Sequence, residues 1–263
     1  MEQTSRRILL LLSLSATFAK YVYINEGKSW TNAQGYCREH YTDLAPVSHE
    51  YDFKRVQLVP GTTAKYLWIG LVRNSTDHEK WTWSGGGQVS TFFWNENQPG
   101  NGPEDGHGQI RDNKWHNAMG TDESTFLCYK AVVVRVRKTW EEALEHCREH
   151  HGDLASVASD TETLLMRKEL GKDKTTARVW TGLRFLAGDW LWVDRQPLSY
   201  EAWGPGGRPE CPQVSRKCGV LRVTGGEQID NAAVEPMGNY SDTGNDGEWE
   251  AFDCAERLHF ICY

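Results

Sequence analysis

Two histidines are the first residues whose types and spacing suggest chemistry. His146 and His150 are four positions apart, so on a helix both imidazoles would lie on one face, where they could share a metal ion. A zinc protease motif places a glutamate directly after the first histidine, but Cys147 occupies that position. The surrounding stretch is strongly charged, and we interpret the pair as part of a solvated helix face.

Acidic residues near the C-terminal end suggest a second kind of chemistry. Asp242, Asp246 and Glu248 could supply an acid pair for hydrolysis, but their spacing favours nothing beyond a plain acidic loop. The sequence contains no nucleophile elbow, no phosphate-binding glycine motif and no dinucleotide fingerprint. We therefore predict that the protein is not an enzyme.

The role of the seven cysteines depends on the compartment, and the N-terminal segment indicates which one. Arg6 and Arg7 precede an apolar stretch over residues 8–19 that ends in small residues. This stretch is too short to span a membrane, and no later segment is long enough. We predict a signal peptide over residues 1–19, cleaved at Ala19, and a secreted protein without a membrane span; a short signal anchor is the alternative.

Composition narrows the classes of partner. The chain has 263 residues, a formal net charge of −7 and no basic runs, which disfavours nucleic acid and anionic membranes as ligands.

The sequons at Asn74 and Asn239 are predicted glycosylation sites, and cysteines in a secreted chain are candidates for disulfides.

One sequence pattern occurs twice, 110 residues apart. Residues 29–45 and 139–155 share the spacing of a hydroxyl residue, Trp, Ala, Cys-Arg-Glu-His and Asp-Leu-Ala. A period of this length exceeds that of solenoid repeats and matches a whole domain, which indicates tandem duplication. We place the first domain at residues 20–130 and the second at residues 131–263.

The elements that position these residues follow the same repeat. Residues 21–24 and 132–134 are predicted opening strands, and Ser29 and Thr139 are predicted helix starts. A second helix is predicted to begin at Ser159, and short strands with long loops follow. Most of the 12 tryptophans recur at equivalent positions of the two copies and are predicted to form the cores. Each copy is therefore predicted to be a small α+β domain.

The repeat also suggests how the cysteines pair. Cys37 and Cys128 are the only cysteines of the first copy, and Cys147 and Cys262 occupy the equivalent places in the second. The pairs Cys37–Cys128 and Cys147–Cys262 would each tie a first helix to a last strand.

A third pair is predicted in the second copy alone. His107 and Gly120 stand in the first copy where Cys218 and Cys254 stand in the second, so both cysteines are missing together. This coherence favours a Cys218–Cys254 disulfide. Cys211 remains, either as a free thiol or as an intermolecular bridge.

Together these features resemble the C-type lectin-like domain, in two units that cover the chain after residue 19. The matching features are the helical and terminal cysteines, the Trp-Ile-Gly-Leu type segments, the Trp-x-Trp strands, and a proline-containing loop before a Trp-led segment. The arrangement is similar to the tandem modules of mannose-receptor-like proteins. The resemblance implies an α+β fold with a long loop region that holds the ligand.

Calcium-dependent members of this family carry Glu-Pro-Asn or Gln-Pro-Asp in the loop and Trp-Asn-Asp downstream, and these residues bind the ion and the sugar. In the first domain the matching segments are Gln98-Pro99-Gly100 and Trp115-His116-Asn117, so one acid is lost at Gly100. The resemblance makes the following residues candidate calcium or ligand contacts: Gln98, Glu104, Asp105 and Asn117. We expect a weak calcium site in the first domain, and the imidazole of His116 suits zinc better than calcium.

The second domain departs further from the family pattern. Its matching segments are Arg208-Pro209-Glu210 and Trp249-Glu250-Ala251, which place a cation and a methyl group at expected ligand positions. Glu210 and Glu250 remain as candidates, and we expect no calcium site here.

The resemblance implies a recognition protein that binds glycans or glycoproteins, with Gln98, Glu104 and Asn117 of the first domain as the better candidates. The alternative is a calcium-independent module that binds a protein ligand through the same loop surface. A weakly constrained chain without a strong ligand is a third interpretation.

Overall fold

The computed structural model describes residues 20–100, 102, 105–172, 178–222 and 247–263. The predicted signal peptide over residues 1–19, Glu104, Asn239, Asp242 and Asp246 lie outside these ranges. Within the described ranges, no helix combines the length and the apolar character that crossing a bilayer requires.

The first domain contains two helices and a seven-stranded sheet. Its elements are β1 (Tyr21–Lys28), α1 (Trp30–His40), β2 (Asp43–Leu44), α2 (Glu50–Gln57), β3 (Leu67–Arg73), β4 (Trp81–Trp83), β5 (His107–Arg111), β6 (Lys114–Ala118) and β7 (Ser124–Tyr129). The strand order is β1-β7-β3-β5-β6, with β2 paired to β7 and β4 to β3. All these pairs are antiparallel except β3 with β7.

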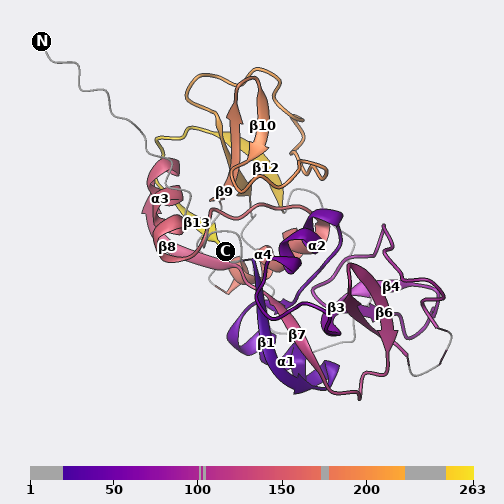
Figure 1. Cartoon of the computed structure of the whole chain (residues 1–263). Helices are drawn as coiled ribbons and strands as arrows, with labels where there is room; N and C mark the ends of the chain where they lie inside the picture. Colours follow the sequence, from indigo (N-terminus) through magenta and orange to yellow (C-terminus); the bar gives the residue numbers. More distant parts are fainter. Residues whose placement is uncertain (1–19, 101, 103–104, 173–177, 223–246) are drawn as a thin grey trace, which may run out of the picture.

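The second domain repeats this plan with a six-stranded sheet (Figure 1). Its elements are β8 (Val132–Lys138), α3 (Trp140–His150), α4 (Asp160–Gly171), β9 (Arg178–Leu186), β10 (Asp189–Trp192), β11 (Cys218–Arg222), β12 (Glu248–Phe252) and β13 (Leu258–Cys262). The strand order is β12-β11-β9-β13-β8, with β10 paired to β9. The predicted α+β class is confirmed.

Helix capping explains where the predicted helices begin. The Ser29 hydroxyl accepts a hydrogen bond from the Asn32 N–H at 3.4 Å. Thr139 and Glu142 form a reciprocal capping box, as their spacing indicates. Three residue types of the repeat then face the core from both first helices, namely Trp30, Ala33 and Cys37 of α1 and Trp140, Ala143 and Cys147 of α3.

Three disulfides join elements that are distant in the sequence, and they are the pairs that the repeat indicates. Cys37–Cys128 links α1 to β7, and Cys147–Cys262 links α3 to β13. All four of these cysteines are fully buried. Cys218–Cys254 links β11 to the turn after β12, and Cys211 is free and exposed.

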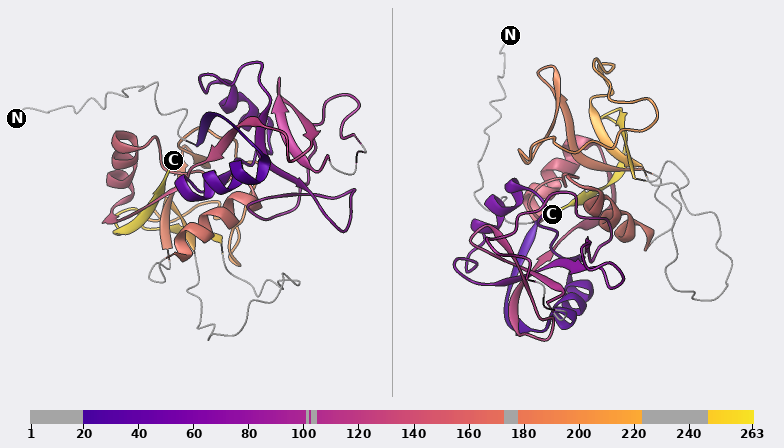
Figure 2. Two further views of the ribbon diagram at one scale, coloured as in Figure 1. Left: turned by 90° about the horizontal axis from the view of Figure 1, so that it is seen from below. Right: turned by 90° about the vertical axis from the view of Figure 1, so that its right-hand side faces the viewer.

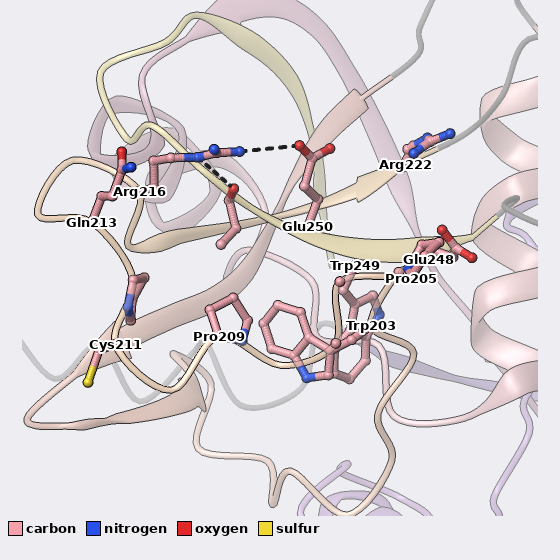
Figure 3. Close-up of a pocket in the computed structure, with 15 residues that line it drawn as sticks. Trp203, Pro205, Pro209, Cys211, Gln213, Arg216, Arg222, Glu248, Trp249 and Glu250 are labelled. Atoms are coloured by element: carbon pink, nitrogen blue, oxygen red, sulfur yellow. Dashed lines mark hydrogen bonds and ion pairs between the residues drawn. The ribbon is translucent and has the colours of Figure 1, made fainter.

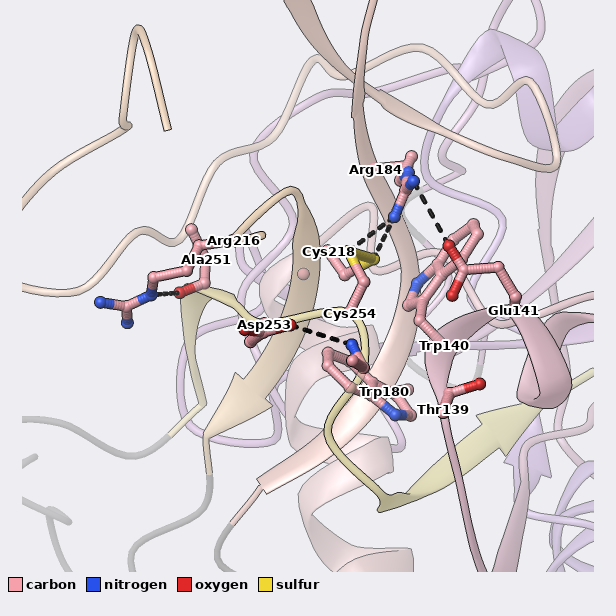
Figure 4. Close-up of a disulfide and its surroundings, with 12 residues drawn as sticks. Thr139, Trp140, Glu141, Trp180, Arg184, Arg216, Cys218, Ala251, Asp253 and Cys254 are labelled. Carbon is pink, nitrogen blue, oxygen red and sulfur yellow. Dashed lines mark hydrogen bonds and ion pairs between the residues drawn. A yellow bond between two sulfur atoms is a disulfide. The ribbon is translucent and has the colours of Figure 1, made fainter. Parts of the chain in front are cut away.

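The surroundings of Cys218–Cys254 explain how the first domain folds without this bridge. In the second domain the Arg184 guanidinium stacks over Trp140 at 4.9 Å and donates a hydrogen bond to the Cys254 Sγ at 2.6 Å (Figure 4). In the first domain His107 occupies the position equivalent to Cys218, and its ring lies 4.6 Å from the Trp30 ring. A β-carbon on Gly120 would lie only 2.5 Å from the same imidazole, so an aromatic contact replaces the covalent one.

The two domains contact each other through equivalent elements. Thr161 of α4 donates a hydrogen bond to the carbonyl of Gly86, in the turn after β4 (3.0 Å). In the reciprocal contact, Arg55 of α2 binds the carboxylate of Asp194, in the turn after β10 (2.7 Å). The second helix of each domain therefore packs against the turn after the Trp-x-Trp strand of the other, and the views in Figure 2 show α4 beside the first domain.

A buried lysine lies at the centre of this contact. The Lys20 ammonium is 2.5 Å from a Glu162 carboxylate oxygen and 3.4 Å from an Asp52 carboxylate oxygen, and each side chain is only 1% exposed. Asp52 and Glu162 occupy equivalent positions of the repeat and cap the second helices by accepting backbone hydrogen bonds. Burial alone lowers the pKa of Lys20, but the two carboxylates hold it above its ordinary value.

Replacing this lysine tests its role as the shared counter-charge. We expect Lys20→Met to lower the free energy of unfolding by roughly 3–5 kcal/mol, because two buried carboxylates would lose their counter-ion. Urea denaturation measures the change. The matched control is Lys28→Met, whose partly exposed ammonium binds the exposed Glu26 and whose loss should cost about 0.5 kcal/mol. Equal costs for the two variants would contradict the interpretation.

Candidate functional site

Gln98 and Asp105 lie in the long loop between β4 and β5 of the first domain, and Glu210 lies in the loop between β10 and β11 of the second. The other described candidates lie on strands, Asn117 on β6 and Glu250 on β12. Short strands on either side hold these loops. In both domains a parallel bridge, Trp94 with Trp115 and Trp203 with Trp249, joins the loop to the Trp-led strand. These tryptophan bridges fix each loop to its sheet. The polar side chains of the loops are the groups that could contact a ligand.

Asn117 of β6 organises the loop of the first domain. Its Oδ1 accepts a hydrogen bond from the Gly100 N–H at 2.8 Å, and its Nδ2 donates to the carbonyls of Gly100 and Asp105, both at 3.0 Å. Gln98 lies beside it, since the Gln98 Oε1 accepts from the Asn117 N–H at 3.1 Å. The structure thus brings Gln98 and Asn117 together, with their side-chain oxygens already bonded to backbone N–H groups.

Arg73, which the sequence reasoning missed, supplies a cation to the same loop. Its guanidinium donates to the Gly100 carbonyl at 2.8 Å and to the Gly102 carbonyl at 3.3 Å, and it stacks over Trp81 at 4.9 Å. The strand register pairs Arg73 with Trp81 as it pairs Phe185 with Trp190 in the second domain. A comparison of the two copies could have pointed to this residue, because the first copy has Arg73 where the second has Phe185.

Gly100 lies where a carboxylate would complete a group of oxygens. A β-carbon at Gly100 would be 3.7 Å from the Asn117 Oδ1 and 3.8 Å from an Asp105 carboxylate oxygen, so the position has room for a side chain. His116 does not belong to this group, because its ring packs edge-on against Tyr66 at 5.1 Å. Burial, followed by the charge of Arg111, lowers the pKa of His116.

The charged candidates of the second domain are bonded to protein groups. Arg208 forms ion pairs with Glu201 at 2.8 Å and with Asp189, and so ties the loop to β10. The Glu250 carboxylate lies 2.8 Å from the Arg178 guanidinium and 3.4 Å from that of Arg216. These contacts neutralise the acid that the family pattern would offer to an ion.

Glu210 and Glu250 face different hollows of the second domain. Glu250 lines a cavity of about 450 Å³ beside Trp203 and Trp249, whereas Glu210 lines a separate hollow of about 340 Å³ beside Arg208. The structure therefore does not bring these two predicted residues together.

The larger cavity is the most developed hollow of the loop face (Figure 3). It is lined by Trp203, Gly204, Pro205, Gly206, Gly207, Pro209, Cys211, Pro212, Gln213, Arg216, Arg222, Glu248, Trp249, Glu250 and Ala251. A buried carboxylate oxygen of Glu248 has no hydrogen-bond partner among the described residues. Ala251 occupies the position that Asn117 has in the first domain. This side of the cavity therefore lacks the polar side chain that occupies the equivalent space in the first domain. The sequence reasoning did not predict the cavity.

Comparisons with known proteins match this architecture. The model of the Lectin C-type domain matches residues 26–130 and 136–263. C-type mannose receptor 2 of Rattus norvegicus is 22% identical over 290 aligned residues, covering 93% of this chain and 18% of the receptor. Secretory phospholipase A2 receptor of Oryctolagus cuniculus is 36% identical over 144 residues, covering 54% of this chain and 8% of the receptor.

Among solved structures, human lithostathine superposes with a TM-score of 0.39 at 23% identity, covering 42% of this chain and 89% of that protein. The chain spans less than a fifth of the receptors' length. Members of the matched family are recognition proteins rather than enzymes. Since the match takes in both halves of the sequence, the chain belongs to the Lectin C-type domain family and contains two of its domains in tandem.

Proposed function

We propose that this chain is a secreted recognition protein that binds carbohydrate-bearing ligands through the loop faces of its two domains, without a calcium ion. The carbohydrate part rests on the family and on the name of the mannose receptor relative. The calcium-independent part rests on one observation, the position of Arg73.

Arg73 supplies to the first loop what a bound cation would supply. Its positive charge and two hydrogen bonds satisfy the carbonyls of Gly100 and Gly102. A calcium ion bound nearby would be repelled by the guanidinium, and it would compete for an Asn117 oxygen that already accepts a hydrogen bond. The loop therefore has its binding shape before any ion arrives, which lowers the entropic cost of binding a ligand.

In the second domain the cavity beside Trp203 is the proposed contact for ligand. It combines apolar ring and proline surface with the Arg222 guanidinium and a Glu248 oxygen that has no hydrogen-bond partner among the described residues. Such a mixture of apolar walls and few polar groups is typical of binding sites. Glu250 is already paired to two arginines, so among the described residues it offers no free carboxylate to a calcium ion.

A second candidate function is calcium-dependent glycan binding by the first domain. The grouping of Gln98, Asn117 and Asp105 around Gly100 favours it, because these side chains carry the oxygens that calcium prefers. A protein ligand would bind to the same loop surface. Glycan-array binding in calcium and in EDTA distinguishes a glycan ligand from a protein ligand.

The proposed function is tested by glycan-array binding of the secreted protein in calcium and again in EDTA. We expect binding that persists in EDTA and that Arg222→Ala weakens about tenfold, whereas the control Val214→Ser leaves it unchanged. Val214 is 87% exposed on the same loop and does not line the cavity. Loss of glycan binding in EDTA would support calcium-dependent glycan binding by the first domain. Absence of glycan binding both in calcium and in EDTA would overturn the proposal that the ligand is a carbohydrate and would favour a protein ligand.

Placing a carboxylate at Gly100 tests whether the lack of an acid at this position explains why the first loop needs no calcium ion. Because a β-carbon fits at Gly100, Gly100→Asp would place a carboxylate beside the Asn117 and Asp105 oxygens. We expect the variant combined with Arg73→Gln to gain a calcium-dependent rise in Tm, and the unaltered chain to melt at the same temperature in calcium and EDTA. A calcium-dependent Tm in the unaltered chain would contradict the proposal.

The secretory part of the proposal has its own test. Asn74 and Thr76 form a compact turn in which the Thr76 hydroxyl donates to the Asn74 Oδ1 at 2.7 Å, on a surface segment accessible to glycosylation. Mass spectrometry of the protein collected from the medium should show Lys20 as the first residue and a glycan at Asn74, which Asn74→Gln removes. A protein retained in the cell with residues 1–19 intact would contradict secretion.

A further inference from the structure

A third hollow lies at the junction of the two domains, away from both loop faces. Its volume is about 280 Å³. The end of α1, the start of β8 and the end of α4 meet there. Its lining residues are His40, Tyr41, Lys130, Ala131, Val132, Val133, Arg135, Glu169 and Lys172.

The described lining of this hollow is rich in cations, although the chain as a whole is acidic. Among the described lining residues, Lys130 and Lys172 contribute two ammonium groups beside Arg135, and Glu169 contributes a carboxylate. Glu169 is already engaged, since its carboxylate lies 2.7 Å from the Lys172 ammonium. Among the lining residues that the structure describes, no other acid lies beside Lys130.

Lys130 is the residue that most clearly lacks a counter-charge. Its backbone N–H donates to the Lys20 carbonyl at 3.0 Å, which fixes it at the domain junction. Within the part of the chain that the structure describes, its ammonium has no hydrogen-bond or ion-pair partner. Burial lowers the pKa of Lys130, and burial is the one cause that acts on it. The pKa of His151 is also lowered, by burial and then by the charge of Lys130, so the positive field extends to its neighbour.

The remaining walls suit a ring with an anionic substituent. Tyr41, Val132 and Val133 provide apolar surface, and the Tyr41 hydroxyl has no partner among the residues described. The volume corresponds to roughly nine water molecules, enough for one substituted sugar ring but not for a large ligand. A sulfate or carboxylate would accept a charge-assisted hydrogen bond from Lys130 while the ring lies against the valines.

We propose that this hollow is a second ligand site, in which Lys130, with Lys172 and Tyr41, binds the sulfate or carboxylate group of an acidic saccharide. The site is separate from the loop faces and needs no metal ion, because the carboxylate among its described lining residues, Glu169, is paired with Lys172. It would direct the protein toward glycans that carry negative charge.

Calorimetry of the two-domain protein in EDTA with three tetrasaccharides tests the proposal. The probes are a sulfated heparin tetrasaccharide, a hyaluronan tetrasaccharide that carries carboxylates alone, and uncharged maltotetraose. We expect one or both acidic probes to bind, and Lys130→Gln to weaken that binding about tenfold. The control Lys54→Gln removes an equal charge from an exposed position of α2 and should have little effect.

A gain-of-affinity variant guards against loss through misfolding. Glu169→Gln removes the acid found among the described lining residues and releases Lys172, so the acidic probe should bind about threefold more tightly. The proposal is overturned if neither acidic probe binds, if Lys130→Gln and Lys54→Gln weaken binding equally, or if Glu169→Gln fails to strengthen it. Arg222→Ala should leave this binding intact, so failure here is distinguishable from failure of the loop-face proposal.

Discussion

The arrangement of the two domains depends on one buried cation between two repeated carboxylates. Duplication placed Asp52 and Glu162 at the same position of each second helix, and the domain contact brings both acids into the interior. Without Lys20 these like charges would repel each other where the solvent cannot screen them. The reciprocal contacts between the domains, such as the ion pair of Arg55 with Asp194, add to this central group of charges.

Within that fixed frame the two copies have diverged at equivalent positions. Arg73 and Asn117 fill the first loop with charge and hydrogen bonds. In the second domain Phe185 and Ala251 stand at these positions, and Ala251 lines the larger cavity while Phe185 lines the smaller hollow. The same exchange occurs at the inner bridge, where the His107 ring replaces a disulfide. Because the core tryptophans and the outer disulfides are shared, each copy could change its loop without losing its fold.

Local signals in the sequence predict the fold, and contacts between distant segments decide the site. The capping box at Thr139, the helix cysteines and the Trp-x-Trp strands each depend on a few neighbouring residues, so the repeat, the α+β class and the disulfide pairs could be predicted. The role of Lys20 could not, since it also bonds Gln196, 176 positions away. Arg73 was missed for the same reason, because its partners belong to a loop that approaches only in the folded chain.

The burial of Lys20 also explains why the junction hollow exists at all. The Lys20 carbonyl accepts the hydrogen bond of the Lys130 N–H, so the contact that buries one lysine holds the next one at the edge of the interface. One wall of the hollow comes from α1 of the first domain and the opposite one from α4 of the second. Neither domain alone encloses it, and the proposed acidic-saccharide site is thus a property of the tandem pair.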